Sequence, residues 1–381
     1  MEDGHFDVIV IGLGGMGSAT AFELARRGRR VLGLEQFALG HDQGSSHGHS
    51  RIIRKAYYEH PDYVPLVQRA FERWYDLEQR QGKHLLTECS CLSIGPRGSE
   101  MLAGVLRSAH EHQLPVEHLQ SGEIRRRYPQ FRFGDEYSGM LERSAGILFV
   151  DDCVQAHLAE ARGLGATLRD REPVIAWKAN PREVVVQTEK DRYVADRLVI
   201  TAGPWARQLL AAFGAHLTVM RQLVFWFGAV EERAFRRDAF PLFIADTAFG
   251  HFYGIPALNA NGVKVAQHYG APELLSPAEI QRTVSAKDEE PVRCFIRAHL
   301  PGADGPRRDA SVCIYTLTPD RHFLIDLHPE HANVVVAAGF SGHGFKFSSV
   351  VGEVLADLAE KGRTDLPIDR FRLTRFAGEP G

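Results

Sequence analysis

Two glycine-rich segments could hold an anionic group. The first, Gly12 to Gly17, has the pattern G-x-G-x-x-G between an apolar run and residues with helical periodicity. In this pattern Gly12 permits a tight turn, Gly14 lets the backbone approach a pyrophosphate, and Gly17 lets helix and strand pack closely. The start of a helix also offers free N–H groups and the positive end of its dipole to phosphates. The segment therefore predicts a dinucleotide site.

An acidic residue follows at the required distance. Glu35 ends the second apolar run, close to the spacing of about 20 residues that such sites use for a ribose-binding carboxylate. The carboxylate can accept hydrogen bonds from both ribose hydroxyls and would repel a 2′-phosphate, which disfavours NADP. The pattern leaves FAD and NAD as alternatives.

The second glycine-rich segment lies near the end of the chain. It contains Gly342, Gly344 and Lys346 and again follows an apolar run. It predicts a second positive helix start, to which Lys346 adds a full charge. A reduced flavin, negatively charged near N1 and C2=O, would be stabilised there. A turn with a solvent-facing lysine is the alternative.

A polar loop carries further basic residues. Arg51 and Arg54 stand three positions apart, as in sites that bind an anion with a fork of donors. Surface ion pairing is the alternative. His47 and His49 stand in the same loop, but two histidines without a supporting carboxylate are a weak metal signal, and we expect no metal.

Composition excludes several classes of protein. The 48 acidic and 45 basic residues leave a net charge of −3, which argues against nucleic-acid binding. Five cysteines form no paired framework, so neither zinc nor disulfides are expected. The chain lacks an apolar leader and any 18-residue apolar run, which predicts a soluble, cytoplasmic protein without a membrane partner. Only eight of the basic residues are lysines, so Lys264 and Lys346 stand out as sites that need an ammonium group.

Apolar periodicity predicts the elements that position these residues. A strand over 6–11, a helix ending at Gly28 and a strand over 31–34 form a right-handed, parallel βαβ unit. Further strands are expected at 184–188, 197–201, 223–230 and 333–338, and helices at 63–79 and 348–361. Aromatic residues between 225 and 253 suit an antiparallel sheet that roofs a pocket.

Together these segments resemble the monomeric sarcosine oxidase and N-methyltryptophan oxidase family of amine-oxidising flavoproteins. The resemblance spans about residues 6 to 375. The matching residues are the first glycine pattern with Glu35, His47-Gly48 with Arg51 to Arg54, Tyr253-Gly254, Lys264 with His268, and the run from Cys313 to Phe347.

The resemblance implies an α/β fold class, α+β overall. A Rossmann-like FAD-binding domain would be joined to a second, mainly antiparallel-sheet substrate domain. We expect the FAD-binding domain to be discontinuous, over 1–85, 146–215 and 313–381. The substrate domain would take 86–145 and 216–312. The family resemblance also implies a monomer.

The resemblance also implies roles for individual residues. FAD would be attached covalently through its 8α-methyl group to Cys313, whose nucleophilic thiolate needs nearby cationic groups. Arg54 and Lys346 would bind a substrate carboxylate, with Tyr253 and His268 flanking the substrate. Arg51, His47 and Lys264 would surround the flavin, and Lys264 would activate oxygen. The expected cofactor set also includes the glycine pattern and these residues: Glu35, Ser45, Val174, Gly342, Gly344 and Lys346.

The implied reaction is oxidation of a secondary amine, with sarcosine the first candidate substrate. Hydride would pass to flavin, the imine would hydrolyse to glycine and formaldehyde, and O2 would be reduced to H2O2. A bulkier substrate such as N-methyltryptophan or pipecolate remains an alternative, because the sequence departs from the family pattern at Ser46, His49, Pro204 and Ile244. A flavin dehydrogenase with another acceptor and a non-catalytic flavin-binding subunit are further alternatives.

Overall fold

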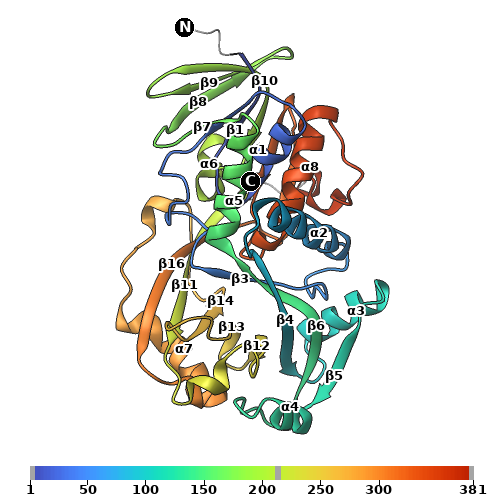
Figure 1. Cartoon of the computed structure of the whole chain (residues 1–381), viewed down its shortest axis with the longest axis vertical. Coiled ribbons are helices and arrows are strands. Elements are labelled where there is room, and N and C mark those ends of the chain that lie inside the picture. Colours follow the sequence, from blue (N-terminus) through green and yellow to red (C-terminus); the bar gives the residue numbers. More distant parts are fainter. Residues whose placement is uncertain (1–4, 211–215, 377–381) are drawn as a thin grey trace.

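The computed structural model describes residues 5–210 and 216–376. Two β-sheets, one above the other along the long axis of the molecule, form two lobes (Figure 1). Helices α1, α5 and α8 lie beside the upper sheet, whose strands β8, β9 and β10 are at the top of the view. The ends of the predicted FAD-binding segments at 1–4, 211–215 and 377–381 lie outside the described residues.

The upper sheet is the predicted nucleotide-binding sheet. Its main order is β17-β18-β10-β1-β2-β7, and the pairs from β18 to β7 are parallel. Continuous apolar runs form its centre because both faces are covered. The strands are β1 (His5–Ile11), β2 (Val31–Leu34), β7 (Thr167–Arg169), β8 (Val174–Ala179), β9 (Val184–Thr188), β10 (Arg192–Ile200), β17 (Leu324–His328) and β18 (His331–Ala338).

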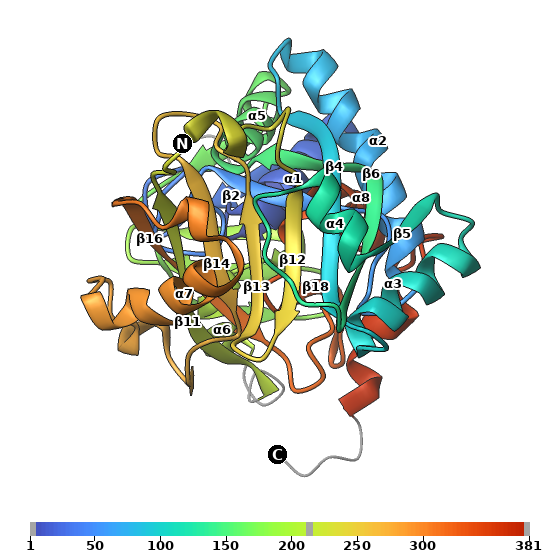
Figure 2. The ribbon, with the colours of Figure 1, turned by 90° about the horizontal axis from the view of Figure 1, so that it is seen from below.

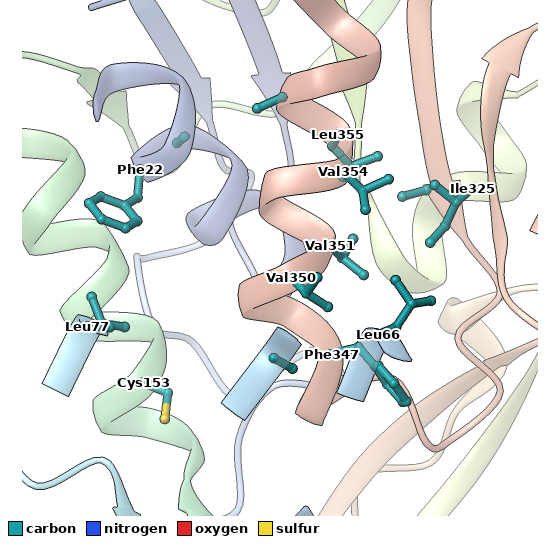
Figure 3. Packing of buried hydrophobic residues seen from close by; sticks show 14 of the residues in the cluster. Phe22, Leu66, Leu77, Cys153, Ile325, Phe347, Val350, Val351, Val354 and Leu355 are labelled. Atoms are coloured by element: carbon teal, nitrogen blue, oxygen red, sulfur yellow. The ribbon is translucent and has the colours of Figure 1, made fainter. Parts of the chain in front are cut away.

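Four helices pack against one another beside this sheet. They are α1 (Gly15–Arg26), α2 (Tyr63–Gln81), α5 (Val150–Gly163) and α8 (Ser348–Lys361). Figure 3 shows Val350, Val351 and Val354 of α8 among buried residues that include Leu66 of α2 and Ile325 of β17. This core holds the β1–α1 turn rigidly in place.

The lower sheet is mainly antiparallel, with the main order β15-β11-β14-β13-β12-β4-β6-β3. Its one parallel pair among the described strands joins β12 to β4. The strands are β3 (Ser50–Ile53), β4 (Leu86–Pro96), β5 (Val116–Gln120), β6 (Tyr137–Phe149), β11 (Thr218–Phe227), β12 (Leu242–Thr247), β13 (Gly250–Ile255), β14 (Val263–His268), β15 (Glu273–Leu274) and β16 (Arg307–Leu317). Figure 2 shows β14, β13, β12 and β4 side by side.

Aromatic residues of the lower sheet mostly form a core of their own. Phe225, Phe227 and Phe243 are fully buried with Phe295 of α7 (Ala286–His299). The expectation that this aromatic stretch roofs the pocket is therefore only partly right. Tyr253 and its neighbour Phe252 line the pocket, whereas Phe225, Phe227 and Phe243 do not. Helices α3 (Glu100–Glu111), α4 (Ser121–Arg127) and α6 (Ala206–Leu209) complete the described helices.

The predicted fold class is confirmed, since a mainly parallel sheet with helices is joined to a mainly antiparallel sheet. The predicted domain boundaries stay a prediction. Two of them, at 145/146 and 312/313, fall inside the long strands β6 and β16. Within the described ranges, no helix is both long and apolar enough to cross a membrane.

Candidate active site

A cavity of about 270 Å³ runs between the two sheets. From the upper lobe it is lined by the β1–α1 turn, by the end of β2 and by the glycine-rich turn after β18. The lower lobe contributes β3, β11, β13 and β16. Segments far apart in the sequence therefore line one cavity.

The first glycine pattern forms the upper end of this cavity. Gly12 has φ +85°, and a Cβ there would lie 2.6 Å from the carbonyl oxygen of Thr201. A Cβ on Gly17 would lie 1.8 Å from the carbonyl oxygen of Gly12. The nearest atom to a Cβ on Gly14 is the Ser46 Oγ at 3.5 Å. Gly12 and Gly17 are thus required by the backbone, whereas Gly14 leaves open space facing the cavity.

Glu35 is held in place at the end of β2. Its carboxylate accepts hydrogen bonds from the Leu13 N–H at 2.9 Å and from the Phe37 N–H at 3.1 Å. The side chain is buried but lines the cavity, as does Val174 at the start of β8. Two backbone donors therefore orient the carboxylate before any ligand binds.

Cys313 lies among cationic groups on β16. The Arg51 guanidinium donates to its Sγ at 3.5 Å and also to the Ser45 carbonyl at 2.9 Å. Burial of Cys313 opposes ionisation, but Arg51, His47 and Lys264 outweigh it and lower the pKa of the thiol to about 6. Buried Cys91 on β4 shows the opposite effect, because burial raises the pKa of its thiol. Cys313 therefore has the thiolate character of a nucleophile.

Hydrogen bonding fixes the tautomer of His47. Its Nε2 lies 3.2 Å from the Gly44 carbonyl oxygen, which can only accept a hydrogen bond, so Nε2 carries the proton. Nδ1 is then an acceptor, 3.3 Å from Ser311 Oγ and 4.0 Å from Cys313 Sγ. His47 can consequently take the thiol proton.

Lys264 lies beneath this cluster rather than in the cavity wall. Its Nζ donates to the carbonyl oxygens of Gly48 and Ser50, both at 2.8 Å. The ammonium also lies 5.0 Å from the ring centroid of Trp226. Burial and then Arg51 lower the pKa of this amine well below its ordinary value. Lys264 can act on the cavity through its charge, but not as a wall residue.

Neutral polar groups also line the cavity. His268 Nδ1 lies 3.0 Å from the Tyr315 hydroxyl. The rings of His268 and Tyr253 are nearly perpendicular, with 6.2 Å between their centroids. Burial lowers the pKa of His268 to about 3 and raises the pKa of Tyr253 to about 12. Both side chains are consequently uncharged near neutral pH.

Arg54 already has a carboxylate partner. Its guanidinium donates to Glu59 Oε2 and to the Ala56 carbonyl, both at 2.8 Å. It also lies over the rings of Tyr57 and Tyr58 at 4.3 and 4.6 Å. Burial opposes ionisation of Glu59, but Arg54 outweighs it and lowers the pKa of that carboxyl to about 2. A second carboxylate would share Arg54 with Glu59 or displace it.

The second glycine segment contributes Lys346. The helix predicted over 348–361 is confirmed as α8, and Lys346 lies in a short 3₁₀ turn, Phe345–Phe347, immediately before it. Gly342 has φ +81°, and a Cβ there would lie 2.4 Å from the Tyr315 ring. A Cβ on Gly344 would meet Phe340 at the same distance. These glycines let the turn pack against β16 and bring Lys346 to the cavity.

Most predicted site residues line this one cavity, and three do not. Gly17, His47 and Lys264 lie behind the wall. The residues that line it are Gly12, Gly14, Glu35, Ser45, Arg51, Arg54, Val174, Tyr253, His268, Cys313, Gly342, Gly344 and Lys346.

The cavity residues outside the predicted set include Glu59, Gln222, Tyr315 and Thr316. Tyr315 could have been found, because it stands two positions after Cys313 in a strand and so shares its face. Gln222 lies opposite Cys313 only through the pairing of β11 with β16. No local signal marks such a neighbour.

The arrangement has the features that FAD requires. The open space at Gly14 and the start of α1, whose Gly14 N-cap lacks a side-chain hydrogen bond, suit the pyrophosphate. The buried Thr316 hydroxyl, which lines the cavity, has no partner among residues 5–210 and 216–376. A buried hydroxyl without a partner is costly, so it marks a contact that a ligand would complete.

A potential metal-binding group lies elsewhere in the fold. His328, Glu330 and His331, at the turn between β17 and β18, bring their ligand atoms within 4.8 Å of one another. None of them lines the cavity.

Comparison with known proteins agrees with this geometry. Residues 7–358 match the family model described as FAD dependent oxidoreductase. The monomeric sarcosine oxidase of Streptomyces avermitilis is 42% identical over 380 residues, covering 98% of this chain and 99% of the relative. The N-methyl-L-tryptophan oxidase of Salmonella arizonae is 35% identical over 375 residues, covering 98% and 99%.

A solved structure has the same overall fold. NikD, described as an unusual amino acid oxidase essential for nikkomycin biosynthesis, superposes with a TM-score of 0.84 at 26% identity. The alignment covers 97% of each chain. The family resemblance expected from the sequence is confirmed.

Proposed function

The chain belongs to the FAD-dependent oxidoreductase family, as an amine-oxidising member, and on that premise we propose that it oxidises a small N-methyl amino acid, sarcosine first. The observation that carries this proposal is the meeting of two groups of residues in one cavity. The cationic side chains of Arg54 and Lys346 face it from one side, and the uncharged Tyr253 and His268 line another part of its wall. An amino acid with a carboxylate and a neutral amine suits that combination.

FAD, when bound, would supply the acceptor for a hydride from the carbon next to the amine and the source of the two electrons that reduce O2 to H2O2. Water hydrolyses the resulting imine, so sarcosine, O2 and water yield glycine, formaldehyde and H2O2. The chain would contribute positioning, charge and exclusion of water.

Arg54 and Lys346 would hold the substrate carboxylate. A guanidinium presents a fork of donors and an ammonium a compact charge, so together they fix the position and orientation of a carboxylate. Glu59 accepts a hydrogen bond from one guanidinium nitrogen of Arg54. The substrate carboxylate would compete with Glu59 for this nitrogen, so the two anions would share Arg54.

Tyr253 and His268 would surround the amine end. Hydride loss requires an unprotonated amine, and the uncharged side chains of Tyr253 and His268 do not stabilise the ammonium form. The pKa values of His268 at about 3 and Tyr253 at about 12 keep both groups neutral over the working range. Turnover should therefore rise with pH through the pKa of the bound amine.

Covalent attachment of FAD through its 8α-methyl group to Cys313 is part of the proposal. Its support is the low pKa of the Cys313 thiol, the neighbouring Arg51, and His47 as an acceptor for the thiol proton. The remaining predicted cofactor contacts, which include Ser45, Val174 and Gly344, would hold the isoalloxazine and adenosine parts.

An oxidase is favoured over a dehydrogenase by Lys264. A buried amine close to Arg51 and Cys313 can stabilise negative charge that develops on oxygen. The proposal also includes a monomer in the cytoplasm. A bulkier secondary amino acid is the second candidate, because Pro204 and Ile244 line the cavity and differ from the family pattern.

A substrate panel with peroxide detection tests the proposal. Sarcosine, N-methylalanine, pipecolate and N-methyltryptophan are compared with sarcosine methyl ester, each in air and anaerobically with an artificial electron acceptor. Sarcosine should give peroxide, and the ester should bind far more weakly. Equal turnover of acid and ester would refute the carboxylate site. Turnover only of bulky amines would favour the second candidate, and turnover only with the artificial acceptor would indicate a dehydrogenase.

A further inference from the structure

Tyr57 joins the two cationic side chains of the cavity. It is fully buried, and Lys346 Nζ donates to its hydroxyl oxygen at 3.3 Å. The Arg54 guanidinium lies over the Tyr57 ring at 4.3 Å. The Tyr57 ring also has an aromatic neighbour, since the Tyr63 ring stacks on it with 4.8 Å between the ring centroids. One side chain thus contacts both groups that would bind a carboxylate.

The direction of the hydrogen bonds around Tyr57 follows from His343. Nε2 of His343 lies 3.0 Å from the Arg321 carbonyl oxygen, which cannot donate, so Nε2 carries the proton and Nδ1 is the acceptor. The Tyr57 hydroxyl lies 2.7 Å from that Nδ1 and 3.3 Å from the His343 carbonyl oxygen. Both atoms are acceptors, so the hydroxyl must donate to His343. Its oxygen is left to accept from Lys346.

This chain of bonds restricts the Lys346 ammonium. A second N–H of Lys346 donates to the His343 carbonyl at 2.8 Å. An ammonium group has three donors, so one remains, and it has no hydrogen-bond acceptor among the residues that the structure describes. The ammonium also lies 5.2 and 5.7 Å from the ring centroids of Tyr57 and Phe347. Because Lys346 lines the cavity, the remaining N–H is available to a ligand there.

Near neutral pH His343 stays neutral and Tyr57 stays protonated, whereas Lys346 carries its third hydrogen fully only below a pH of about 7. Burial lowers the pKa of His343 to about 4 and raises the pKa of Tyr57 well above its ordinary value. Burial and then Arg54 lower the pKa of Lys346 to about 7. The other charged or titratable groups acting on Lys346 are Glu59, Arg51 and Cys91, of which Glu59 and Cys91 favour its protonated form.

We propose that Tyr57 and His343 are positioning residues that aim the third N–H of Lys346 at the substrate carboxylate. This inference rests on the proposed role of Lys346 and adds the residues that orient it. His343 fixes the direction of the Tyr57 hydroxyl. The Tyr57 oxygen and the His343 carbonyl accept two of the three hydrogen bonds that Lys346 can donate. The third N–H of Lys346 is therefore the one left to point into the cavity.

Paired hydroxyl deletions test the inference on the holoenzyme. Tyr57→Phe removes the acceptor for Lys346 and keeps the ring beneath Arg54. Tyr63→Phe is the matched control, because its ring stacks on Tyr57 while its hydroxyl meets His322 Nδ1 at 3.0 Å instead. The probe is methoxyacetate, a carboxylate of sarcosine's size without the amine, and its dissociation constant is measured from the flavin absorption spectrum.

Tyr57→Phe should raise the dissociation constant of methoxyacetate about 10-fold, the effect expected for loss of one hydrogen bond to a charged group. Neutral methoxyacetamide should bind equally to both enzymes, and Tyr63→Phe should match the unaltered protein with either probe. Equal affinities of Tyr57→Phe and Tyr63→Phe for methoxyacetate would overturn the inference.

The pH dependence of methoxyacetate binding adds a readout that general damage to the fold would not produce. Lys346 binds an anion in its protonated form, so affinity should fall as pH rises through its pKa of about 7. Loss of the Tyr57 acceptor disfavours the ammonium, so Tyr57→Phe should move this midpoint to lower pH. An unmoved midpoint would count against the inference.

Substitutions at His343 test the direction of the bond. The Asn side-chain oxygen can take the place of the His343 Nδ1 acceptor, so His343→Asn should bind methoxyacetate nearly as the unaltered protein does. His343→Leu should weaken binding of methoxyacetate, but less than Tyr57→Phe does, because the hydroxyl remains and can still donate to the backbone carbonyl of residue 343. Equal affinities of the two His343 variants would overturn the role of His343.

Lys346→Met separates failure of the inference from failure of the proposed function. If Lys346→Met leaves methoxyacetate binding unchanged, Lys346 does not bind the carboxylate, and both fail. If Lys346→Met weakens binding while Tyr57→Phe does not, the proposed function stands and the inference alone is wrong.

Discussion

At the scale of single residues, the chemistry of the cavity is set by which groups are buried together. Cys313 and Cys91 are both buried in the same sheet, yet the pKa of one thiol is lowered to about 6 and that of the other is raised. The difference arises because Arg51, His47 and Lys264 lie near Cys313 and outweigh burial there. Burial with cations makes a nucleophile, and burial alone makes an inert apolar side chain.

Cys313→Ser should abolish covalent flavin attachment, because a serine hydroxyl lacks the thiolate character that Cys313 has. After acid precipitation, flavin should stay with the unaltered protein and appear in the supernatant of the variant. Cys91→Ser is the control and should retain its flavin. Release of all flavin from the unaltered protein would rule out the covalent bond.

Lys264→Met should slow reoxidation of the reduced flavin roughly 100- to 1000-fold, as for loss of one preorganised charge stabiliser. Anaerobic reduction by substrate should change much less, and Lys287→Met, on the exposed surface of α7, should change neither rate. Stopped-flow spectroscopy separates the two half-reactions. Equal slowing of both would contradict a specific role in oxygen activation.

The same lysine predicts a pH dependence. Burial and Arg51 lower the pKa of Lys264 well below its ordinary value, and only the protonated form carries the stabilising charge. Reoxidation should therefore be fastest below that lowered pKa and slow as pH rises through it, a dependence absent from Lys264→Met.

At the scale of elements, the β1–α1 turn contains glycines that are needed for two different reasons, close packing at Gly17 and ligand access at Gly14. Gly17→Ala would drive a methyl group against the Gly12 carbonyl, 1.8 Å from the new Cβ. Overpacking of this kind costs about 1–3 kcal/mol. Gly14→Ala meets no protein atom closer than 3.5 Å, but it points toward the expected pyrophosphate.

Urea denaturation and FAD titration distinguish these glycine variants when both are made in the Cys313→Ser background, in which FAD can be removed. Gly17→Ala should lower the stability of the flavin-free protein. Gly14→Ala should leave that stability near its original value and weaken FAD binding. Similar stability losses in both variants would show that Gly14 is also a packing residue.

Helices α2 and α8 are joined by an ion-pair cluster. Glu353 of α8 receives hydrogen bonds from Arg69 and Arg73 of α2 at 2.8 to 3.0 Å. Burial opposes ionisation of Glu353, but the two arginines outweigh it and lower the pKa of this carboxyl to about 2. A carboxyl with a lowered pKa stabilises the fold above its unfolded-state pKa and loses that contribution as pH falls.

Glu353→Gln should therefore lower the thermal midpoint near neutral pH, and the difference from the unaltered protein should shrink as pH falls from 4.5 toward 2. Differential scanning calorimetry across this range gives the comparison. Glu72→Gln is the control, because Glu72 is an exposed partner of Arg69 on α2 and surface pairs contribute little. A pH-independent difference at Glu353 would exclude the ionic contribution.

At the scale of the whole molecule, the cavity lies between two sheets, so a ligand that fills it stabilises both lobes together. Ligand binding to the folded state alone adds stability by mass action, about 2.7 kcal/mol at a concentration one hundred times the dissociation constant. In Cys313→Ser freed of flavin, the thermal midpoint should rise with added FAD in a single transition. Two separate transitions, of which FAD moves only one, would show that the lobes unfold independently.

Local patterns determined the nucleotide-binding half and the family. Gly12, Gly14, Gly17 and Glu35 stand within one strand–turn–helix–strand unit, where backbone dihedral angles and periodicity act over a few residues. That unit was therefore predictable in its elements and in its use. The cationic side chains of Arg54 and Lys346 and the thiol of Cys313 were also identifiable from the sequence. Their chemical type and their segment of the chain could be predicted in this way, but their neighbours in space could not.

Tertiary structure alone decided what these groups face. The contacts of Tyr57 with Lys346 and of Gln222 with Cys313 depend on strand register and on packing between segments up to hundreds of residues apart. Lys264 lies behind the cavity wall for the same reason, because the pairing of β14 with β11 directs it toward the Gly48 and Ser50 carbonyls. A residue's type determines which bonds it can make, but its partner is determined by packing of the complete chain.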